Sequence, residues 1–274
     1  MKDHDQDPSP RLRVWGLSGP PIVALHGGPA AVGEAAPLAA GLSRSFRVWE
    51  PWQRGSGPEA LTVERHVEDL ARVVECCPSA PALVGESWGA MLALAYATAH
   101  PETVTAIVLV GCGTFDASAR ATLERTLAAR TTPELRVRLD EIDRGCADPD
   151  ARLAAFRLAT EPLYGVDVRD DGVIREAIDS RAFTETWGDM LRLQREGVYP
   201  AAFASIEAPV LMLHGADDPH PGPAIFAGLQ AHIPRIEYRQ LDSCGHQPWR
   251  ERAARREFFE VLVEWLTENA QDAD

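Results

Sequence analysis

The chain has 274 residues, of which 45% are hydrophobic and 25% are charged. This length fits one large α/β domain or two small ones, and it allows a sizeable core without disulfides. The net charge of −14 argues against nucleic acid and anionic membranes as partners, because both repel an acidic surface.

The cysteines and the N-terminal residues indicate in which cellular compartment the protein is found. Five cysteines with no C-x-x-C pair favour reduced thiols over a disulfide framework and argue against a zinc site. Residues 1–7 are polar and acidic, which is not the pattern of a signal peptide. No apolar run approaches the ~18 residues that a membrane span needs. We therefore expect a cytoplasmic protein without a bound metal, and the sequence gives no indication of its oligomeric state.

Short apolar runs mark the first elements in chain order. Residues 1–10 are expected to form a loose tail and residues 11–15 a first edge strand. Residues 21–25 form a compact apolar run that ends in a glycine turn, and residues 46–50 give a second strand of this kind. Thr62 is placed to cap a helix, because the apolar residues after it recur at helical spacing.

The same alternation of apolar runs and helices continues to the end of the chain. Such short runs without polar alternation are typical of parallel strands that are covered on both faces. Strands are expected at 81–84, 104–110, 208–213 and 236–241, and helices at about 90–97 and 250–268.

Residues 114–205 interrupt this pattern. They are rich in arginine and acidic residues, lack buried-strand runs, and predict helices near 117–130, 133–145, 150–160, 172–180 and 184–196. We therefore predict an α/β fold with a mostly parallel central sheet and helices on both faces. Its core comprises residues 1–113 and 206–274, and residues 114–205 form an inserted helical cap.

The segment Gly85-Glu86-Ser87-Trp88-Gly89 joins a predicted strand to a predicted helix. In that context G-x-S-x-G predicts a nucleophile elbow, a sharp turn that exposes the serine hydroxyl. Side chains in place of the two glycines would collide with neighbouring elements. Ser87 is therefore the candidate nucleophile. Glu86 beside it is either a buried hydrogen-bond partner or a substrate contact.

A nucleophilic serine needs a base and an acid that orients the base. Among the eight histidines, His246 is the best candidate, because it lies in a turn between the last strand and the last helix. The acid is expected in the turn after strand 208–213, which offers Asp217 and Asp218, and Asp218 is favoured. Asp116 is a more remote alternative. His220 shares the loop of the acid and is excluded as the base.

The oxyanion formed on attack needs N–H donors that are already in place. The residue after the serine, Trp88, can supply one backbone N–H, and Gly28 in the turn His26-Gly27-Gly28-Pro29 can supply the other. Adjacent glycines also allow the backbone to approach a substrate closely.

These motifs resemble those of the α/β-hydrolase fold superfamily over residues 20–110 and 205–270. The order Ser87, Asp218, His246 is the order that the superfamily uses. The turn Gly215-Ala216-Asp217-Asp218 resembles its G-x-x-D acid turn, and Gly245-His246 resembles its terminal G-H turn. The resemblance implies a serine hydrolase with a cap.

Within the superfamily, the glycine turn at 26–29 and Ser87-Trp88-Gly89 are similar to the proline iminopeptidase-like group. The chain departs from that group's pattern at Ala30 and Glu86, where glycine is usual. Trp52 also replaces the aspartate of a D-x-R-G-x-G turn. Serine at position 87, where epoxide hydrolases and haloalkane dehalogenases carry aspartate, argues against those two chemistries.

Our leading hypothesis is a cofactor-free serine hydrolase that cleaves a small ester or amide through an acyl-enzyme. The first alternative is an aminopeptidase of the proline iminopeptidase kind, whose substrate amine would need acids such as Glu161, Glu185 or Asp189. The second alternative is a catalytically silent binding protein on a hydrolase scaffold. A lyase that uses the same three residues is also open.

Overall fold

The computed structural model describes residues 11–169 and 177–270. Its centre is a seven-stranded sheet with the order β1-β3-β2-β4-β5-β6-β7. All neighbouring strands are parallel except β1, which pairs antiparallel with β3 at one edge. The strands are β1 (Leu12–Trp15), β2 (Pro21–Leu25), β3 (Arg47–Pro51), β4 (Ala82–Glu86), β5 (Ile107–Val110), β6 (Val210–Gly215) and β7 (Ile236–Leu241).

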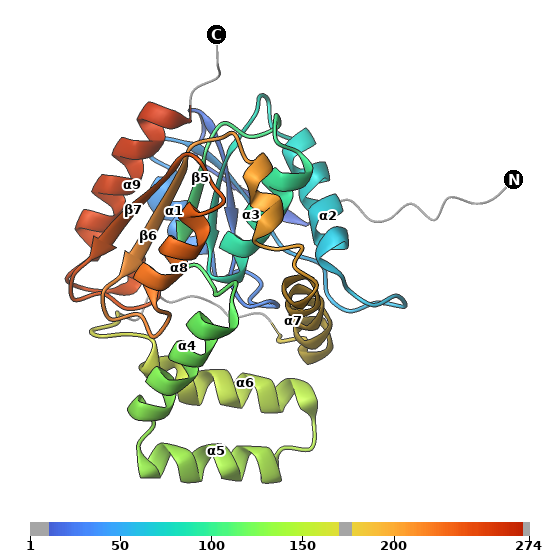
Figure 1. Cartoon of the computed structure of the whole chain (residues 1–274), viewed down its shortest axis with the longest axis vertical. Coiled ribbons are helices and arrows are strands. Elements are labelled where there is room, and N and C mark those ends of the chain that lie inside the picture. Colours follow the sequence, from blue (N-terminus) through green and yellow to red (C-terminus); the bar gives the residue numbers. More distant parts are fainter. Residues whose placement is uncertain (1–10, 170–176, 271–274) are drawn as a thin grey trace, which may run out of the picture.

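Helices cover both faces of the sheet (Figure 1). One face packs against α2 (Val63–Glu75), α3 (Trp88–Ala99) and α8 (Gly222–Gln230). The other face packs against α1 (Ala36–Leu42) and α9 (Arg255–Asn269). Because β2, β4, β5 and β6 are buried along their whole length, their sequences are continuously apolar rather than alternating. The predicted fold class is confirmed.

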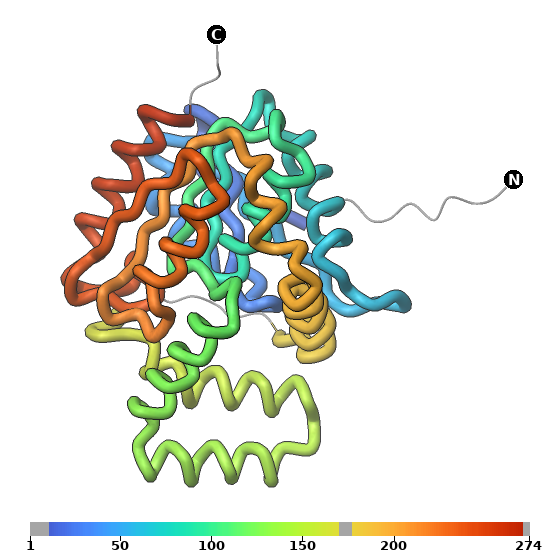
Figure 2. Tube along the Cα trace, viewed as in Figure 1, coloured from blue at the N-terminus to red at the C-terminus, as the bar shows by residue number. Residues whose placement is uncertain are grey.

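The chain leaves the sheet after β5 and returns to it at β6, and between them lies the helical segment, residues 114–205 (Figure 2). Its described residues form α4 (Ala117–Arg130), α5 (Pro133–Gly145), α6 (Pro149–Thr160) and α7 (Ser180–Arg195), with short 3₁₀ turns η1 (Glu161–Leu163) and η2 (Ala201–Ser205). The helices α5 and α6 lie side by side.

Most boundaries within the helical segment agree with the sequence. The helix expected at 184–196 begins earlier, at Ser180, because the Asp179 side chain accepts a hydrogen bond from Ala182 N at 2.8 Å and caps it. The helix expected at 172–180 falls mainly on 170–176, outside the described residues, and residues 177–179 are not helical. The division into core and cap remains our proposal.

Two other expected helices can be compared with the structure. Thr62 caps α2 as expected, with its Oγ1 accepting from Arg65 N at 3.2 Å. The last helix begins at Arg255 rather than near residue 250, because Pro248–Arg250 forms a separate 3₁₀ turn, η3. Among the residues that the structure describes, no helix is long and apolar enough to cross a membrane.

Candidate active site

Ser87 lies in a sharp turn between β4 and α3. Its backbone has φ +53° and ψ −113°, in a region that residues with a Cβ rarely adopt. A Cβ at Gly85 would overlap the Gly89 carbonyl oxygen, and a Cβ at Gly89 would overlap the Leu25 carbonyl oxygen. The two glycines therefore let strand and helix approach closely enough to form the strained turn. This geometry is that of a nucleophile elbow.

Gly28, Ser87 and Trp88 line the same cavity. The φ of +112° at Gly28 favours glycine, and a Cβ there would lie 2.8 Å from Ala31 N. Trp88 is the first residue of α3, and the N–H groups of a first helical turn lack partners within the helix. The two backbone positions expected to donate to an oxyanion thus border the same cavity as the serine.

His246 and Asp218 form a direct hydrogen bond between Nδ1 and Oδ2, 2.7 Å long. The Asp218 side chain is fully buried, whereas Asp217 is exposed. Asp116, the remote alternative, instead caps α4 by accepting from Ala119 N at 2.8 Å. Of the three acids considered from the sequence, only Asp218 orients the imidazole of His246.

Asp218 also holds His220, which reasoning from the sequence passed over. Its Oδ1 accepts from His220 N and contacts His220 Nδ1, both at 2.9 Å. The His220 ring stacks on the His246 ring, with centroids 4.6 Å apart and planes 17° apart. His220 therefore fixes the carboxylate and supports one face of the imidazole. The Asp-x-His spacing within one loop is the sequence signal that could have indicated this contact.

Asp218, His220 and His246 also bring three possible metal-ligand atoms within 4.8 Å of one another. Each carboxylate oxygen of Asp218 already contacts one imidazole nitrogen at hydrogen-bond distance. This hydrogen-bond network accounts for the cluster by itself. No other group of this kind occurs in the part of the chain that the structure describes.

Two further histidines have the structural roles expected for strand-end residues. His26 Nδ1 lies 2.8 Å from Gly27 O, and its Nε2 accepts from Gln53 N at 3.3 Å. His214 Nε2 lies 3.0 Å from His220 O. Both rings thus contact turn backbone, and His214 Nε2 also lies 3.3 Å from Asp218 Oδ2.

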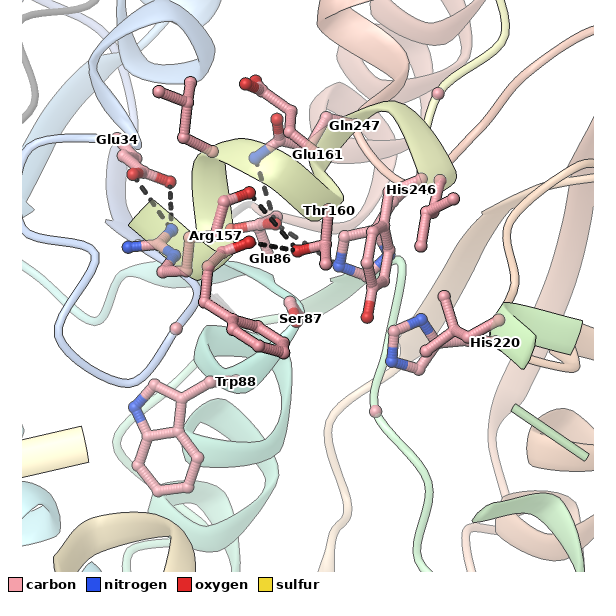
Figure 3. A pocket seen from close by; sticks show the side chains of 18 of the residues that line it. Glu34, Glu86, Ser87, Trp88, Arg157, Thr160, Glu161, His220, His246 and Gln247 are labelled. Carbon is pink, nitrogen blue, oxygen red and sulfur yellow. Dashed lines mark hydrogen bonds and ion pairs between the residues drawn. The ribbon is translucent and has the colours of Figure 1, made fainter. Parts of the chain in front are cut away.

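Ser87 and His246 line one cavity together with Glu86, the last residue of β4 (Figure 3). His246 Nε2, the nitrogen that does not contact Asp218, lies 3.6 Å from Glu86 Oε1. Among the described residues, Ser87 and His246 are not joined by a hydrogen bond. Catalytic hydrogen bonds are often long in ligand-free enzymes and tighten when substrate binds. Both side chains nevertheless border the same cavity.

Glu86 is buried beside both the glycine turn and the imidazole. Its Oε1 accepts from Gln247 Nε2 at 3.3 Å, and its carboxylate packs against Gly27, where a Cβ would collide with it. Burial raises the pKa of Glu86, while the neighbouring charge of His246 opposes that rise. Of the two roles left open from the sequence, the buried hydrogen-bond partner is observed, and Glu86 also lines the cavity.

The carboxylates control the protonation of His246. Burial disfavours its charged form, but the charge and hydrogen bond of Asp218, with the charge of Glu86, outweigh burial and raise the pKa of His246 to about 9. Burial would likewise raise the pKa of Asp218, yet His246 and His220 hold that pKa well below its usual value. Asp218 is thus a stable counter-charge for an imidazolium.

The cavity has a volume of about 880 Å³. Its floor is the elbow, and the helical segment supplies most of its walls. The apolar side chains include Met91, Leu123, Leu127, Leu153, Phe156, Phe183 and Trp187. A cavity of this size and polarity fits a small organic molecule.

The acids considered as ligands for a substrate amine have other partners. Glu161 lines the cavity and forms an ion pair with Arg250 at 2.6 Å. Glu185 Oε2 accepts from Leu61 N at 2.9 Å, and Asp189 Oδ2 accepts from Val63 N at 2.8 Å. These two hydrogen bonds join α7 to the start of α2, and neither Glu185 nor Asp189 lines the cavity.

Comparisons with known proteins agree with this geometry. The family model described as alpha/beta hydrolase fold matches residues 20–248. The chain is 25% identical to the proline iminopeptidase of Lactobacillus helveticus, over 91% of this chain and 90% of that protein. It is 29% identical to the pimeloyl-[acyl-carrier protein] methyl ester esterase of Aromatoleum aromaticum, over 85% of this chain and 93% of that protein.

The fold is also found among solved structures. That of VinJ matches with a TM-score of 0.68 at 20% identity, over 94% of both chains. The family match covers most of the chain, and the resemblance stated from the sequence motifs is confirmed. The chain is an enzyme of the alpha/beta hydrolase fold family.

Proposed function

We propose that the protein is a serine hydrolase that cleaves a small ester through an acyl-enzyme. The observation that carries this proposal is the convergence of three elements on one cavity. The elbow presents Ser87 there, the turn after β7 presents His246, and Asp218 holds His246 by the 2.7 Å bond to its Nδ1. Separate loops at the carboxyl ends of parallel strands supply the three side chains, as in other open α/β sheets.

In the proposed reaction, Ser87 Oγ attacks the ester carbonyl carbon while His246 Nε2 takes the hydroxyl proton. The carbonyl oxygen becomes an oxyanion that accepts hydrogen bonds from the backbone N–H groups of Gly28 and Trp88. His246 then gives its proton to the departing alkoxide, so that the alcohol leaves and an ester to Ser87 remains. Water, deprotonated by His246, attacks this acyl-enzyme and releases the acid.

Asp218 acts through His246 in this scheme. Its carboxylate keeps the proton of the neutral imidazole on Nδ1, so that Nε2 can accept the proton of Ser87. It also stabilises the imidazolium that forms, in agreement with its lowered pKa. His220 keeps the second carboxylate oxygen of Asp218 occupied.

Esters are favoured over N-terminal proline substrates because of the charges around the cavity. The sequence likeness extends both to a proline iminopeptidase and to a methyl ester esterase. An aminopeptidase must bind a free α-amine, and Glu161, Glu185 and Asp189 all have other partners among the described residues. Proline 4-nitroanilide should therefore be a much poorer substrate than a 4-nitrophenyl ester.

Ester hydrolysis by purified variants tests the proposal. Ser87→Ala should lower kcat for 4-nitrophenyl butyrate by about 10⁴-fold or more, since loss of such a serine removes covalent catalysis. The matched control is Ser118→Ala, which removes an exposed hydroxyl on α4 and should leave kcat unchanged. Comparable turnover by the Ser87→Ala and wild-type proteins would refute the proposal.

A further inference from the structure

Charged side chains on the cavity wall differ in how they are compensated. Arg157 pairs with Glu34 at 3.0 Å, and Arg250 pairs with Glu161 at 2.6 Å. Each of these arginines is therefore matched by a carboxylate.

The carboxylate of Glu251 is also satisfied, by backbone donors. It accepts from Val166 N and Asp167 N, both at 2.9 Å, and from Gly245 N at 3.0 Å. These contacts hold the chain after η1 against the turn that carries His246. Glu251 is thus neutralised by N–H groups and not by a cation in the cavity.

Arg120 is the exception on this wall. It lines the cavity from the first turn of α4, on the same side as Leu123 and Leu127, three and seven residues later. Its Nη2 donates to Gln194 Oε1, a neutral amide. Among the described residues Arg120 pairs with no carboxylate, and its buried Nε–H has no hydrogen-bond partner.

The local structure holds Arg120 in place without neutralising it. Gln194 on α7, which receives the Arg120 hydrogen bond, itself donates to Thr114 O at 3.1 Å. Thr114 also lines the cavity and follows β5. A guanidinium fixed by neutral groups beside apolar walls bears a desolvation cost that an anion would offset.

The charge count specifies the anion. Because Arg157 and Arg250 are paired with carboxylates, Arg120 adds one positive charge to the cavity wall that no carboxylate among the described residues pairs with. Guanidinium groups bind carboxylates through short, charge-assisted hydrogen bonds, and apolar surroundings strengthen them. One positive charge matches one carboxylate, whereas a phosphate group would bring up to two negative charges. The net charge of −14 makes such a local cation necessary for holding an anion.

We propose that Arg120 forms a carboxylate-binding subsite, and that the substrate is a half-ester whose second carboxyl group is free. This inference rests on the proposed function for the reaction, but the subsite itself does not require catalysis. The ester group would lie at Ser87 while the free carboxylate reaches Arg120, so the apolar walls would contact the carbon chain between them. Arg120 is a specificity-determining residue in this arrangement.

A pair of substrates of nearly equal size tests the subsite. Mono-4-nitrophenyl adipate carries a free carboxylate, and its methyl ester, 4-nitrophenyl methyl adipate, has none. The same pairs made from pimelate and suberate vary the length of the chain. For the wild type we expect a higher kcat/KM for the acid than for its methyl ester at the chain length that spans the cavity.

Arg120→Gln should lower the acid-to-methyl-ester ratio of kcat/KM by about 10- to 100-fold, the usual effect of losing a hydrogen-bonded charge partner. Arg120→Lys should retain part of the preference, because it keeps the charge but not the planar donors. The matched control is Arg125→Gln on the same helix. Arg125 is exposed and contacts Thr122, so the ratio should not change. An unchanged ratio in Arg120→Gln would overturn the subsite.

A binding measurement separates failure of the subsite from failure of the proposed reaction. Calorimetric titration of Ser87→Ala protein with monomethyl adipate requires no turnover. Binding that is weakened at least 10-fold by adding Arg120→Gln supports the subsite even if the wild type hydrolyses neither ester. Equal binding with and without Arg120, or none at all, overturns the subsite and leaves a hydrolase of neutral esters intact.

Discussion

Glu86 directly precedes Ser87, and its carboxylate approaches His246, the base of the proposed reaction. A negative charge 3.6 Å from His246 Nε2 stabilises the imidazolium, and this effect adds to that of Asp218. A free enzyme with His246 protonated cannot accept the proton of Ser87. In the proposed reaction, Glu86 therefore adds to Asp218 in setting the pH at which His246 becomes neutral.

The pH dependence of kcat/KM should reveal this control. Activity requires neutral His246, so kcat/KM should rise with pH through the His246 pKa of about 9. Glu86→Gln removes the negative charge that raises this pKa, and the rising limb should move to lower pH. Profiles measured with 4-nitrophenyl butyrate provide the test, and Glu68→Gln, an exposed residue of α2, serves as control. If the rising limbs of the kcat/KM profiles coincide in wild type and Glu86→Gln, the role of Glu86 is contradicted.

For single residues, roles that depend on a local motif could be predicted from the sequence, whereas contacts that depend on tertiary packing could not. Ser87, Asp218 and His246 could be proposed because each lies in a short motif directly after a strand. The partner of Arg120 could not be proposed, since it depends on how α4 packs against α7. The partners of Glu185 and Asp189, the backbone N–H groups of Leu61 and Val63, lie more than 120 residues away in the chain and could not be proposed for the same reason.

The helices differ sharply in how deeply they are buried. α3 buries nearly all of its residues beneath the sheet, whereas α5 buries none of its own. On α6, Phe156 and Leu158 line the cavity yet remain exposed at 40% and 55%. Helices with so little buried apolar surface open locally at low free-energy cost. We infer that α5 and α6 open locally before the other helices do when a substrate enters the cavity.

Amide hydrogen exchange followed by mass spectrometry tests this inference. Peptides from α5 should exchange through local opening, orders of magnitude faster than those from α3, whose amides should require opening of the core. Labelling Ser87 with a phosphonate that fills the cavity should slow exchange in α6 and leave α3 unchanged. Equal protection of α5 and α3 in the unlabelled protein would contradict the burial argument.

At the element scale, the sheet was readily predicted and some helices were not. Strands buried on both faces must be continuously apolar, so β2, β4, β5 and β6 are evident from composition. Helix α1 has seven residues and no side-chain cap. It is too short to show a helical repeat of apolar residues and has no capping residue to mark its start, so the sequence did not predict it. The early start of α7 depends on Asp179, one acidic residue among several in that part of the chain.

The acid stability of the whole molecule should depend on buried neutral histidines. Burial lowers the pKa of both His26 and His66 to about 4. His66 packs between α2 and α7, with Nε2 at 2.9 Å from Thr186 Oγ1. Between the unfolded value of 6.5 and the folded value of about 4, the unfolded chain binds a proton that the folded chain does not. Stability from His66 is therefore complete above pH 6.5 and lost as pH falls towards 4.

Urea unfolding at pH 7 and pH 5 measures this loss. Relative to His66→Gln, the wild type should lose about 2 kcal/mol more unfolding free energy between the two pH values, from roughly 1.5 pKa units of linkage. Other titrating groups, His246 included, are common to both proteins and cancel in the comparison. Equal pH dependence for the two proteins would show that His66 is not held neutral by the fold.

The central claim is that one serine at the β4–α3 turn becomes covalently acylated. Intact-protein mass spectrometry after treatment with a fluorophosphonate, followed by peptide mapping, tests this claim most directly. We expect a single adduct, located on Ser87, that forms slowly or not at all in His246→Gln. An unmodified protein, or an adduct on any other residue that persists in Ser87→Ala, would contradict it.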